Sequence, residues 1–259
     1  MSEIRFDDGA AYERSMGGWS RLAGEVFLDW LAPEAGLRWV DVGCGNGAFT
    51  ELIVQRTAPA EVEAIDPSEG QLAFARTRQG AKGATFRHGD AQALPFEADR
   101  FDAAAKALVI YFVPDPANGV AEMARVVRPG GEVVGYAWDF TRAGFPFEPV
   151  QAELRAMGLT PPRPPHWQIA SPDALSALWA SAGLRDVALR DIAVRRTWPD
   201  FDTFWADTAG TASLSNLVAK LSPEMLAALH DRLRAKLMDA EGRVAYGSLA
   251  TAVRGRVPG

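Results

Sequence analysis

Three aspartates lie at the ends of three short apolar segments near the start of the chain. Asp41 lies in "RWVDVGCGNGAF", Asp66 ends "EVEAID", and Asp90 follows "ATFRHG". Carboxylates accept hydrogen bonds and attract cations. If these segments are neighbouring parallel strands, their carboxyl ends meet at the edge where open α/β sheets bind ligands. The three aspartates are therefore candidate ligand contacts.

A glycine-rich turn follows Asp41. Gly43, Gly45 and Ala48 fit the loose pattern of a dinucleotide-binding loop, and Gly43, Gly45 and Gly47 fit the related spacing G-x-G-x-G. Either match is weak by itself, because a tight turn from strand to helix also needs glycine for its backbone geometry. The glycines alone leave a nucleotide-like ligand and a plain turn open.

The charge of Asp41 separates two classes of ligand. A dinucleotide would place a dianionic pyrophosphate over the loop, and a carboxylate repels it. S-adenosylmethionine would bring a sulfonium cation and an ammonium group, which a carboxylate attracts. Asp66 would accept the ribose hydroxyls of either cofactor. Asp90 would accept the adenine amino group, while the Ala91 N–H meets a ring nitrogen. The pattern favours S-adenosylmethionine, with S-adenosylhomocysteine as its product.

Strands and helices alternate along the chain around these residues. We expect strands at 38–42, 61–66 and 84–88, within 101–110, and at 131–138, 186–197 and 243–254. We expect helices at 20–32 and 48–57, from Ser68, at 115–127, from Ser171, and from Ser222. The alternation predicts an α/β fold with a doubly wound, mostly parallel sheet and helices on both faces. Residues 1–259 are expected to form a single domain, with lid-like insertions at about 140–170 and 200–240.

The composition excludes several classes of protein. A net charge of −6 argues against a nucleic-acid-binding surface. The single cysteine, Cys44, excludes a disulfide framework and a cysteine-rich zinc site, so we interpret it as a small loop residue and expect no metal. No apolar run has the length of a membrane span, and the acidic N-terminus is unlike a signal peptide. We expect a cytoplasmic monomer or homodimer without nucleic-acid or membrane partners.

Five motifs resemble one known family in their order and spacing. They are "VDVGCGNGAF", "AIDPSEGQLAFAR", "GDAQALPF", "FDAAAKALVIYFVPDP" and "EMARVVRPGG". Together they resemble class I S-adenosylmethionine-dependent methyltransferases, most of all the ubiquinone/menaquinone-biosynthesis type, from about Tyr12 to Trp138. The resemblance implies seven strands in the order 3-2-1-4-5-7-6, with the seventh antiparallel.

The resemblance also implies roles for residues of the cofactor site. Positions matching Asp41, Gly43, Cys44 and Gly45 would lie at the methionine end, and Asp66 would hold the ribose. The adenine would lie between the positions matching Pro67, Asp90 and Ala91. Tyr12 and Trp19 would be wall residues of an N-terminal helical region that folds over the cofactor.

Lys106 departs from the family pattern, because relatives usually carry a small residue at that strand end. It could contact the cofactor, anchor an acidic substrate, act as a base, or pair with an aspartate at the rim. Methyl transfer needs mainly positioning, and a general base only where the attacking atom keeps a proton. Lys106, Tyr111, Asp139 and His166 are the weak catalytic candidates.

The two insertions suggest a closed, aromatic-walled pocket for a small and at least partly apolar methyl acceptor. Two other functions stay open at this point. One is an NAD(P)-linked oxidoreductase, and the other is a protein that binds S-adenosylmethionine without transferring its methyl group. The sequence does not identify the acceptor, or say whether carbon, oxygen or nitrogen is methylated.

Overall fold

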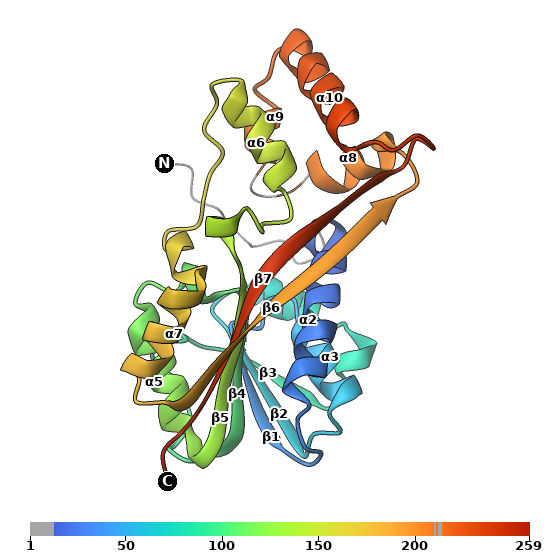
Figure 1. Ribbon diagram of the computed structural model, residues 1–259. Coiled ribbons are helices and arrows are strands. Elements are labelled where there is room, and N and C mark those ends of the chain that lie inside the picture. Colours follow the sequence, from blue (N-terminus) through green and yellow to red (C-terminus); the bar gives the residue numbers. More distant parts are fainter. Residues whose placement is uncertain (1–12, 210, 212–213) are drawn as a thin grey trace.

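One mixed sheet organises the protein. The computed structural model describes residues 13–209, 211 and 214–259. Within these residues seven strands pair in the order β3-β2-β1-β4-β5-β7-β6, which confirms the expected fold (Figure 1). The strands are β1 (Arg38–Val42), β2 (Glu61–Asp66), β3 (Ala84–His88), β4 (Phe101–Ala107), β5 (Val127–Trp138), β6 (Arg185–Trp198) and β7 (Val244–Arg256).

The first five strands run parallel, and β7 is antiparallel to both β5 and β6. The central strands are short and apolar, and β1 is buried from Trp39 to Val42. Such runs suit strands that helices cover on both faces. The parallel pairing brings the carboxyl ends of β1, β2 and β3 to one edge, where the aspartates were expected to meet.

Helices cover both faces of this sheet. In Figure 1, α2 (Gly18–Leu31) and α3 (Ala48–Arg56) lie on one side, and α5 (Pro116–Val126) and α7 (Pro172–Ser181) lie on the other. The hydroxyls of Ser68 and Ser171 accept the backbone N–H three residues on, at 3.3 Å each, and so cap α4 (Glu69–Ala75) and α7 as predicted.

A second group of helices lies beyond the carboxyl ends of the parallel strands, where β6 and β7 extend toward it (Figure 1). It contains α6 (Glu148–Ala156), α8 (Phe201–Ala209), α9 (Ser215–Val218) and α10 (Pro223–Leu237). No helix was expected from the sequence in the insertion at about 140–170, but Val150 and Leu154 are both buried one helical turn apart on α6. Their spacing after Pro149 explains the helix.

Several single turns complete the secondary structure. They are the π-helical turn η1 (Glu13–Gly17) and the 3-10 turns η2 (Gln79–Ala81), η3 (Ile110–Phe112), η4 (Phe140–Arg142) and η5 (Trp167–Ala170). None of the described helices is long and apolar enough to cross a membrane.

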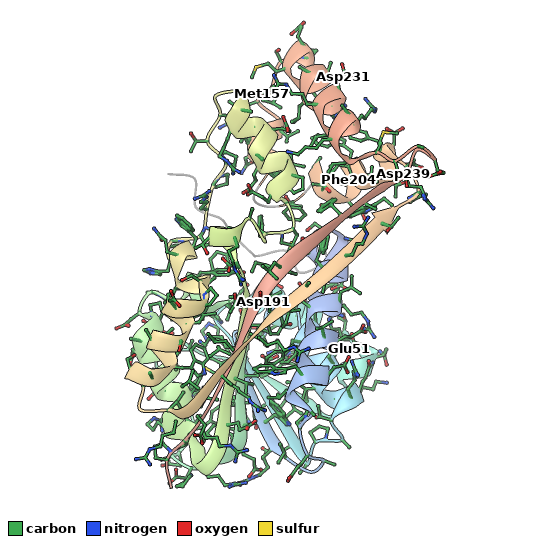
Figure 2. The ribbon with its side chains drawn as sticks, in the orientation of Figure 1. Glu51, Met157, Asp191, Phe204, Asp231 and Asp239 are labelled. Atoms are coloured by element: carbon green, nitrogen blue, oxygen red, sulfur yellow. The ribbon has the colours of Figure 1, made fainter. Side chains whose placement is uncertain are left out.

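An aromatic cluster joins the sheet to the second group of helices, α6 and α8 to α10. The Trp198 ring lies 5.3 Å from both Phe204 and Tyr246, measured between ring centroids. Trp19 lies 5.3 Å from Tyr246 and 6.5 Å from Trp138. Figure 2 shows Phe204 where these helices meet the long strands. Since all five side chains are buried, the core continues from the sheet into this layer.

Candidate functional site

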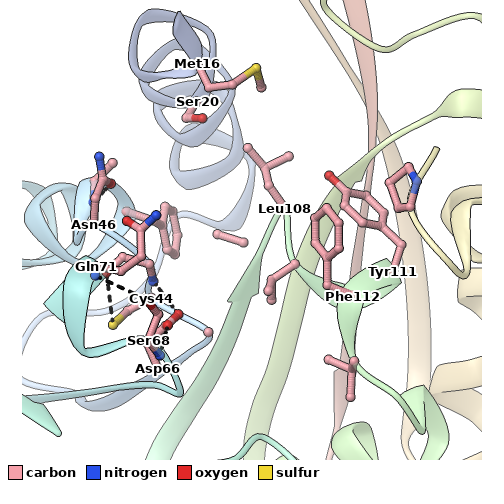
Figure 3. Close-up of a pocket in the computed structure, with 18 of the residues that line it drawn as sticks. Met16, Ser20, Cys44, Asn46, Asp66, Ser68, Gln71, Leu108, Tyr111 and Phe112 are labelled. Carbon is pink, nitrogen blue, oxygen red and sulfur yellow. Dashed lines mark hydrogen bonds between the residues drawn. The ribbon is translucent and has the colours of Figure 1, made fainter. Parts of the chain in front are cut away.

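A cavity of about 520 Å³ opens at the carboxyl edge of the sheet. One end is formed by the glycine loop and the turns after β2 and β3, and the other by aromatic side chains after β4 and β5. Figure 3 shows both ends, with Cys44 and Asp66 opposite Tyr111 and Phe112 and with Leu108 between them. The volume lies within the usual range for small-molecule sites.

The glycine loop is held tightly under the cavity. The N–H groups of Gly43 and Cys44 both donate to the carbonyl of Ile65, at 2.7 and 3.0 Å. Gly43 has a φ of 80°, and a Cβ there would lie 2.7 Å from a methyl group of Val109. Only glycine fits that conformation and that contact.

Asp41 lies fully buried beneath the loop and lines the cavity. One carboxylate oxygen accepts a 2.6 Å hydrogen bond from the Thr50 hydroxyl, and the other has no partner within the described residues. Burial raises the pKa of Asp41 to about 7. A buried carboxylate with an unused oxygen is suited to an arriving cation or hydrogen-bond donor.

Asp66 ends β2 and also lines the cavity. Its carboxylate accepts N–H bonds from Gly45 at 2.8 Å and Ser68 at 2.9 Å, while burial raises its pKa. Each oxygen can accept more than one hydrogen bond, so the side chain can brace the glycine loop and still bind a diol.

Pro67, Asp90 and Ala91 complete the polar end of the cavity. The Asp90 carboxylate accepts the N–H of Gln92 at 2.9 Å, which fixes the turn after β3. The structure thus brings the three aspartates expected from the sequence to one wall.

Cys44 lines the same wall with its thiol buried. Burial, reinforced by Asp41 and Asp66, raises its pKa well above the usual thiol value. The thiol is therefore protonated, so Cys44 is a small loop residue and not a nucleophile.

Lys106, expected from the sequence as a cofactor contact or catalytic residue, does not line the cavity. Its neighbour Ala107 lines the cavity, but Lys106 points to the opposite face of β4, near Gly119 of α5. Successive side chains of a strand alternate between faces, so a one-residue offset moves this lysine out of the site. Lys106 is 1% exposed, and its Nζ has no hydrogen-bond partner within the described residues. Burial lowers the pKa of Lys106 to about 7, although the charges of Asp90 and Asp41 act in the opposite direction.

The catalytic candidates Asp139 and His166 also lie outside the cavity lining. Asp139 is fully buried and caps η4, accepting the N–H of Thr141 at 2.8 Å and pairing with Arg142. Against the effect of burial, these bonds keep the pKa of Asp139 below its usual value. The N–H of His166 donates to the Tyr111 carbonyl at 3.2 Å. Of the candidates Tyr111, Asp139 and His166, only Tyr111 lines the cavity.

The N-terminal wall differs from the expected one. Trp19 is fully buried in the aromatic cluster and does not line the cavity, and Tyr12 lies outside the described residues. Ser15, Met16 and Ser20 line the cavity instead. Trp19 thus anchors α2 in the core, while neighbouring residues with smaller or flexible side chains face the ligand space.

An aromatic-walled pocket was expected from the sequence, but among the residues at the aromatic end only Tyr111 was expected by position. That end is lined by Leu108, Tyr111, Phe112, Trp138, Phe140, Phe145, Phe147, Pro162, Pro164, Thr211 and Ser215. The spacing of Phe145 and Phe147 in a proline-containing insertion was the available signal. The described lining contains no lysine, arginine or histidine. Its carboxylates are those of Asp41, Asp66 and Asp90, so its charged groups are all acidic.

The described residues were also compared with the ligand sets that bind metal ions. Within the described residues, no group of three or more histidines, cysteines, aspartates or glutamates is placed to hold a metal ion.

Comparison with known proteins identifies a family and several relatives. A family model described as a methyltransferase domain matches residues 40–135. The 2-methyl-6-phytyl-1,4-hydroquinone methyltransferase 2 of Oryza sativa is 46% identical over 95 residues, covering 37% of this chain and 27% of that protein. The match thus spans about a quarter of the rice enzyme.

Two further similarities cover more of the chain. The demethylmenaquinone methyltransferase of Clavibacter sepedonicus is 30% identical over 189 residues, covering 72% of this chain and 70% of that protein. A chain in the complex of the Haloferax volcanii Trm112 methyltransferase activator with a methyltransferase matches over the full length of both chains, with 20% identity and a TM-score of 0.63, which shows the shared fold. The protein therefore belongs to the class I S-adenosylmethionine-dependent methyltransferases and resembles their ubiquinone/menaquinone-biosynthesis type.

Proposed function

We propose that the polar end of the cavity binds S-adenosylmethionine. The amino acid part would lie on the glycine loop near Asp41, the ribose at Asp66, and the adenine by Asp90 and Ala91. This cofactor supplies an activated methyl group when bound. The unused oxygen of buried Asp41 is the observation that best supports the assignment, since it provides an acceptor for a cationic ligand.

The charge of the lining disfavours an NAD(P) cofactor. A pyrophosphate would enter a wall whose charged groups are three carboxylates and whose described residues supply no basic side chain. Backbone N–H groups alone would have to offset that repulsion. The same lining favours a ligand with a sulfonium and an ammonium group.

We also propose that the methyl acceptor is uncharged and largely apolar. The aromatic end offers rings and prolines, with hydroxyls from Tyr111, Thr211 and Ser215, and no described cation to bind a carboxylate or phosphate. The named substrates of the rice and Clavibacter relatives contain a hydroquinone or a quinone. An aromatic quinol is therefore the acceptor class to test first.

Positioning would carry most of the rate enhancement in this arrangement. The buried rings Tyr111, Phe140 and Phe147 would exclude water and align the acceptor with the methyl group. No described histidine or lysine lies in the lining to remove a proton. The acceptor would need an acidic hydroxyl of its own, or Tyr111 as its hydrogen-bond partner.

We also propose that residues 1–259 form a single methyltransferase domain. The insertions carrying α6 and α8 to α10 would cover the acceptor end, while the seven-stranded part holds the cofactor. A molar mass measured by light scattering would distinguish the two expected states, a monomer and a homodimer.

Calorimetric titration with S-adenosylhomocysteine tests the cofactor assignment. We expect micromolar binding of S-adenosylhomocysteine and no detectable binding of NAD or NADP. Binding of NAD or NADP without binding of S-adenosylhomocysteine would overturn the proposal. Incubation with methyl-labelled cofactor and a series of quinols then tests transfer. Tight binding with no labelled product from any quinol would favour a binding protein over an enzyme acting on this class.

A further inference from the structure

A group of polar contacts joins the N-terminal segment to the glycine loop. Glu13, the first residue of η1, accepts a 2.9 Å hydrogen bond from the side-chain amide of Asn46 in that loop. The same carboxylate oxygen pairs with a guanidinium nitrogen of Arg78, which follows α4. Residues far apart in sequence thus meet at one carboxylate.

Arg78 is held in place without help from Glu13. Its Nε donates to the Asn46 carbonyl at 2.6 Å, and its Nη1 donates to Glu51 of α3 at 3.0 Å. The side chains of Arg78 and Glu51 are 11% and 15% exposed, so this half of the contact is largely buried. A fixed guanidinium loses little freedom when a second carboxylate reaches it.

The partner carboxylate is much more accessible. The Glu13 side chain is 39% exposed, and an ion pair that water reaches is weaker than a buried one. The contact with Glu13 can therefore break at a lower cost than a buried ion pair.

The local backbone allows Glu13 to fold back over its own turn. A Cβ at Gly17 would lie 2.8 Å from the carboxyl carbon of Glu13, closer than side-chain atoms tolerate. The missing side chain at position 17 leaves the room that the Glu13 carboxylate uses.

The residues just beyond Glu13 cover the cavity. Ser15, Met16 and Ser20 line it, and Figure 3 shows Met16 and Ser20 above the side chains of the cofactor wall. Trp19 fixes the following helix in the aromatic core. We call residues 13–18 the roof segment, which is tied at one end by Trp19 and at the other by Glu13.

We propose that Glu13 is a positioning residue that latches the roof segment onto Asn46 and Arg78, and that release of this latch lets the cofactor and its product exchange. The inference rests on the proposed binding of S-adenosylmethionine in this cavity. Glu13 and Arg78 do not line the cavity, whereas Asn46 does, so Glu13 acts on the ligand space through Asn46 and through its neighbours Ser15 and Met16.

The test compares Glu13→Gln with the unmodified protein by surface plasmon resonance with S-adenosylhomocysteine. We expect the dissociation rate to rise about tenfold, which corresponds to the loss of one charge-assisted contact. The association rate should change by less than about threefold, because a looser roof does not slow entry. The thermal midpoint should stay unchanged, because the roof opens without unfolding the core.

Glu25→Gln is the matched control. It removes the exposed Arg21–Glu25 pair from α2, the same helical region, without touching the glycine loop. It should leave the dissociation rate unchanged. Added salt should speed dissociation from the unmodified protein and the control, but have little further effect on Glu13→Gln.

Two results would overturn the latch. One is an unchanged dissociation rate in Glu13→Gln, and the other is an equal rise in Glu25→Gln. If the unmodified protein does not bind S-adenosylhomocysteine at all, the cofactor assignment fails instead, and the two failures are distinguishable.

Discussion

The Thr50 hydroxyl donates a 2.6 Å hydrogen bond to one carboxylate oxygen of Asp41, and the other oxygen of Asp41 has no described partner. Thr50 belongs to the helix that follows the glycine loop, so the contact joins β1 to α3 beneath the cavity. The carboxylate is thus oriented before any ligand arrives. One of its two oxygens is left for the ligand.

The pH dependence of cofactor binding should report on Asp41. Its pKa near 7, raised by burial, means that this carboxylate is mostly protonated at pH 6 and ionised at pH 8. A cationic ligand binds the ionised form, so affinity for S-adenosylmethionine should increase about tenfold over that range. Isothermal titration at several pH values measures it.

Asp41→Asn is the matched variant for this prediction. It should bind S-adenosylmethionine more weakly and lose most of the pH dependence, because the amide carries no charge. Adenosine lacks the sulfonium and ammonium groups, so its affinity should change little in either protein. A slope of the same size in Asp41→Asn would contradict the electrostatic role.

Asp66→Ala should weaken S-adenosylmethionine binding by roughly 1–3 kcal/mol, or about fivefold to 150-fold. The substitution removes the proposed ribose contact and also the acceptor that braces the Gly45 N–H. Asp66→Asn keeps one carbonyl oxygen for that N–H, so its loss should be smaller. Equal affinity in all three proteins, measured by calorimetry, would rule out the ribose assignment.

Lys106→Met should stabilise the protein at pH 7, by up to a few kcal/mol. Burial lowers the pKa of Lys106 from 10.5 to about 7, so the unfolded chain binds more protons than the folded one between these values. The penalty is therefore largest below about pH 7 and shrinks as the pH rises toward 10. Methionine fills similar space without a buried charge.

Urea unfolding at pH 6 and pH 9 checks this prediction. The advantage of Lys106→Met over the unmodified protein should fall by roughly half between these pH values. Lys236→Met is the control, since Lys236 is half exposed and paired with Glu153 at 3.2 Å, and it should shift stability by less than about 0.5 kcal/mol. A destabilised Lys106→Met would mean that the buried ammonium has a favourable partner.

Asp139→Ala should lower stability by about 3 kcal/mol, because it leaves the Thr141 N–H and the Arg142 pair without their buried acceptor. Cofactor affinity should stay within about threefold, since Asp139 does not line the cavity. Denaturant unfolding and calorimetry give the two quantities. Lost turnover of the acceptor with unchanged stability would instead indicate the catalytic role that the structure disfavours.

The sequence by itself determined the local features that positioned the cofactor wall. Strand segments at β1, β2 and β3 were predicted with their observed bounds, and the caps at Ser68 and Ser171 form as expected. Asp41, Asp66 and Asp90 could be placed together because parallel strands share one carboxyl edge. The order of the outer strands came from the family resemblance and not from the pattern of residues.

Only the tertiary structure decided which way several side chains point. Lys106 and Ala107 are adjacent, and which of them faces the cavity depends on which face of β4 is covered by α5. Asp139 turns into a local network with Arg142, and Trp19 turns into an aromatic core built from β5, β6 and β7. Residue type and spacing set what a side chain can do, but contacts between distant elements select its direction, because each face of a strand or helix is defined only by what packs against it.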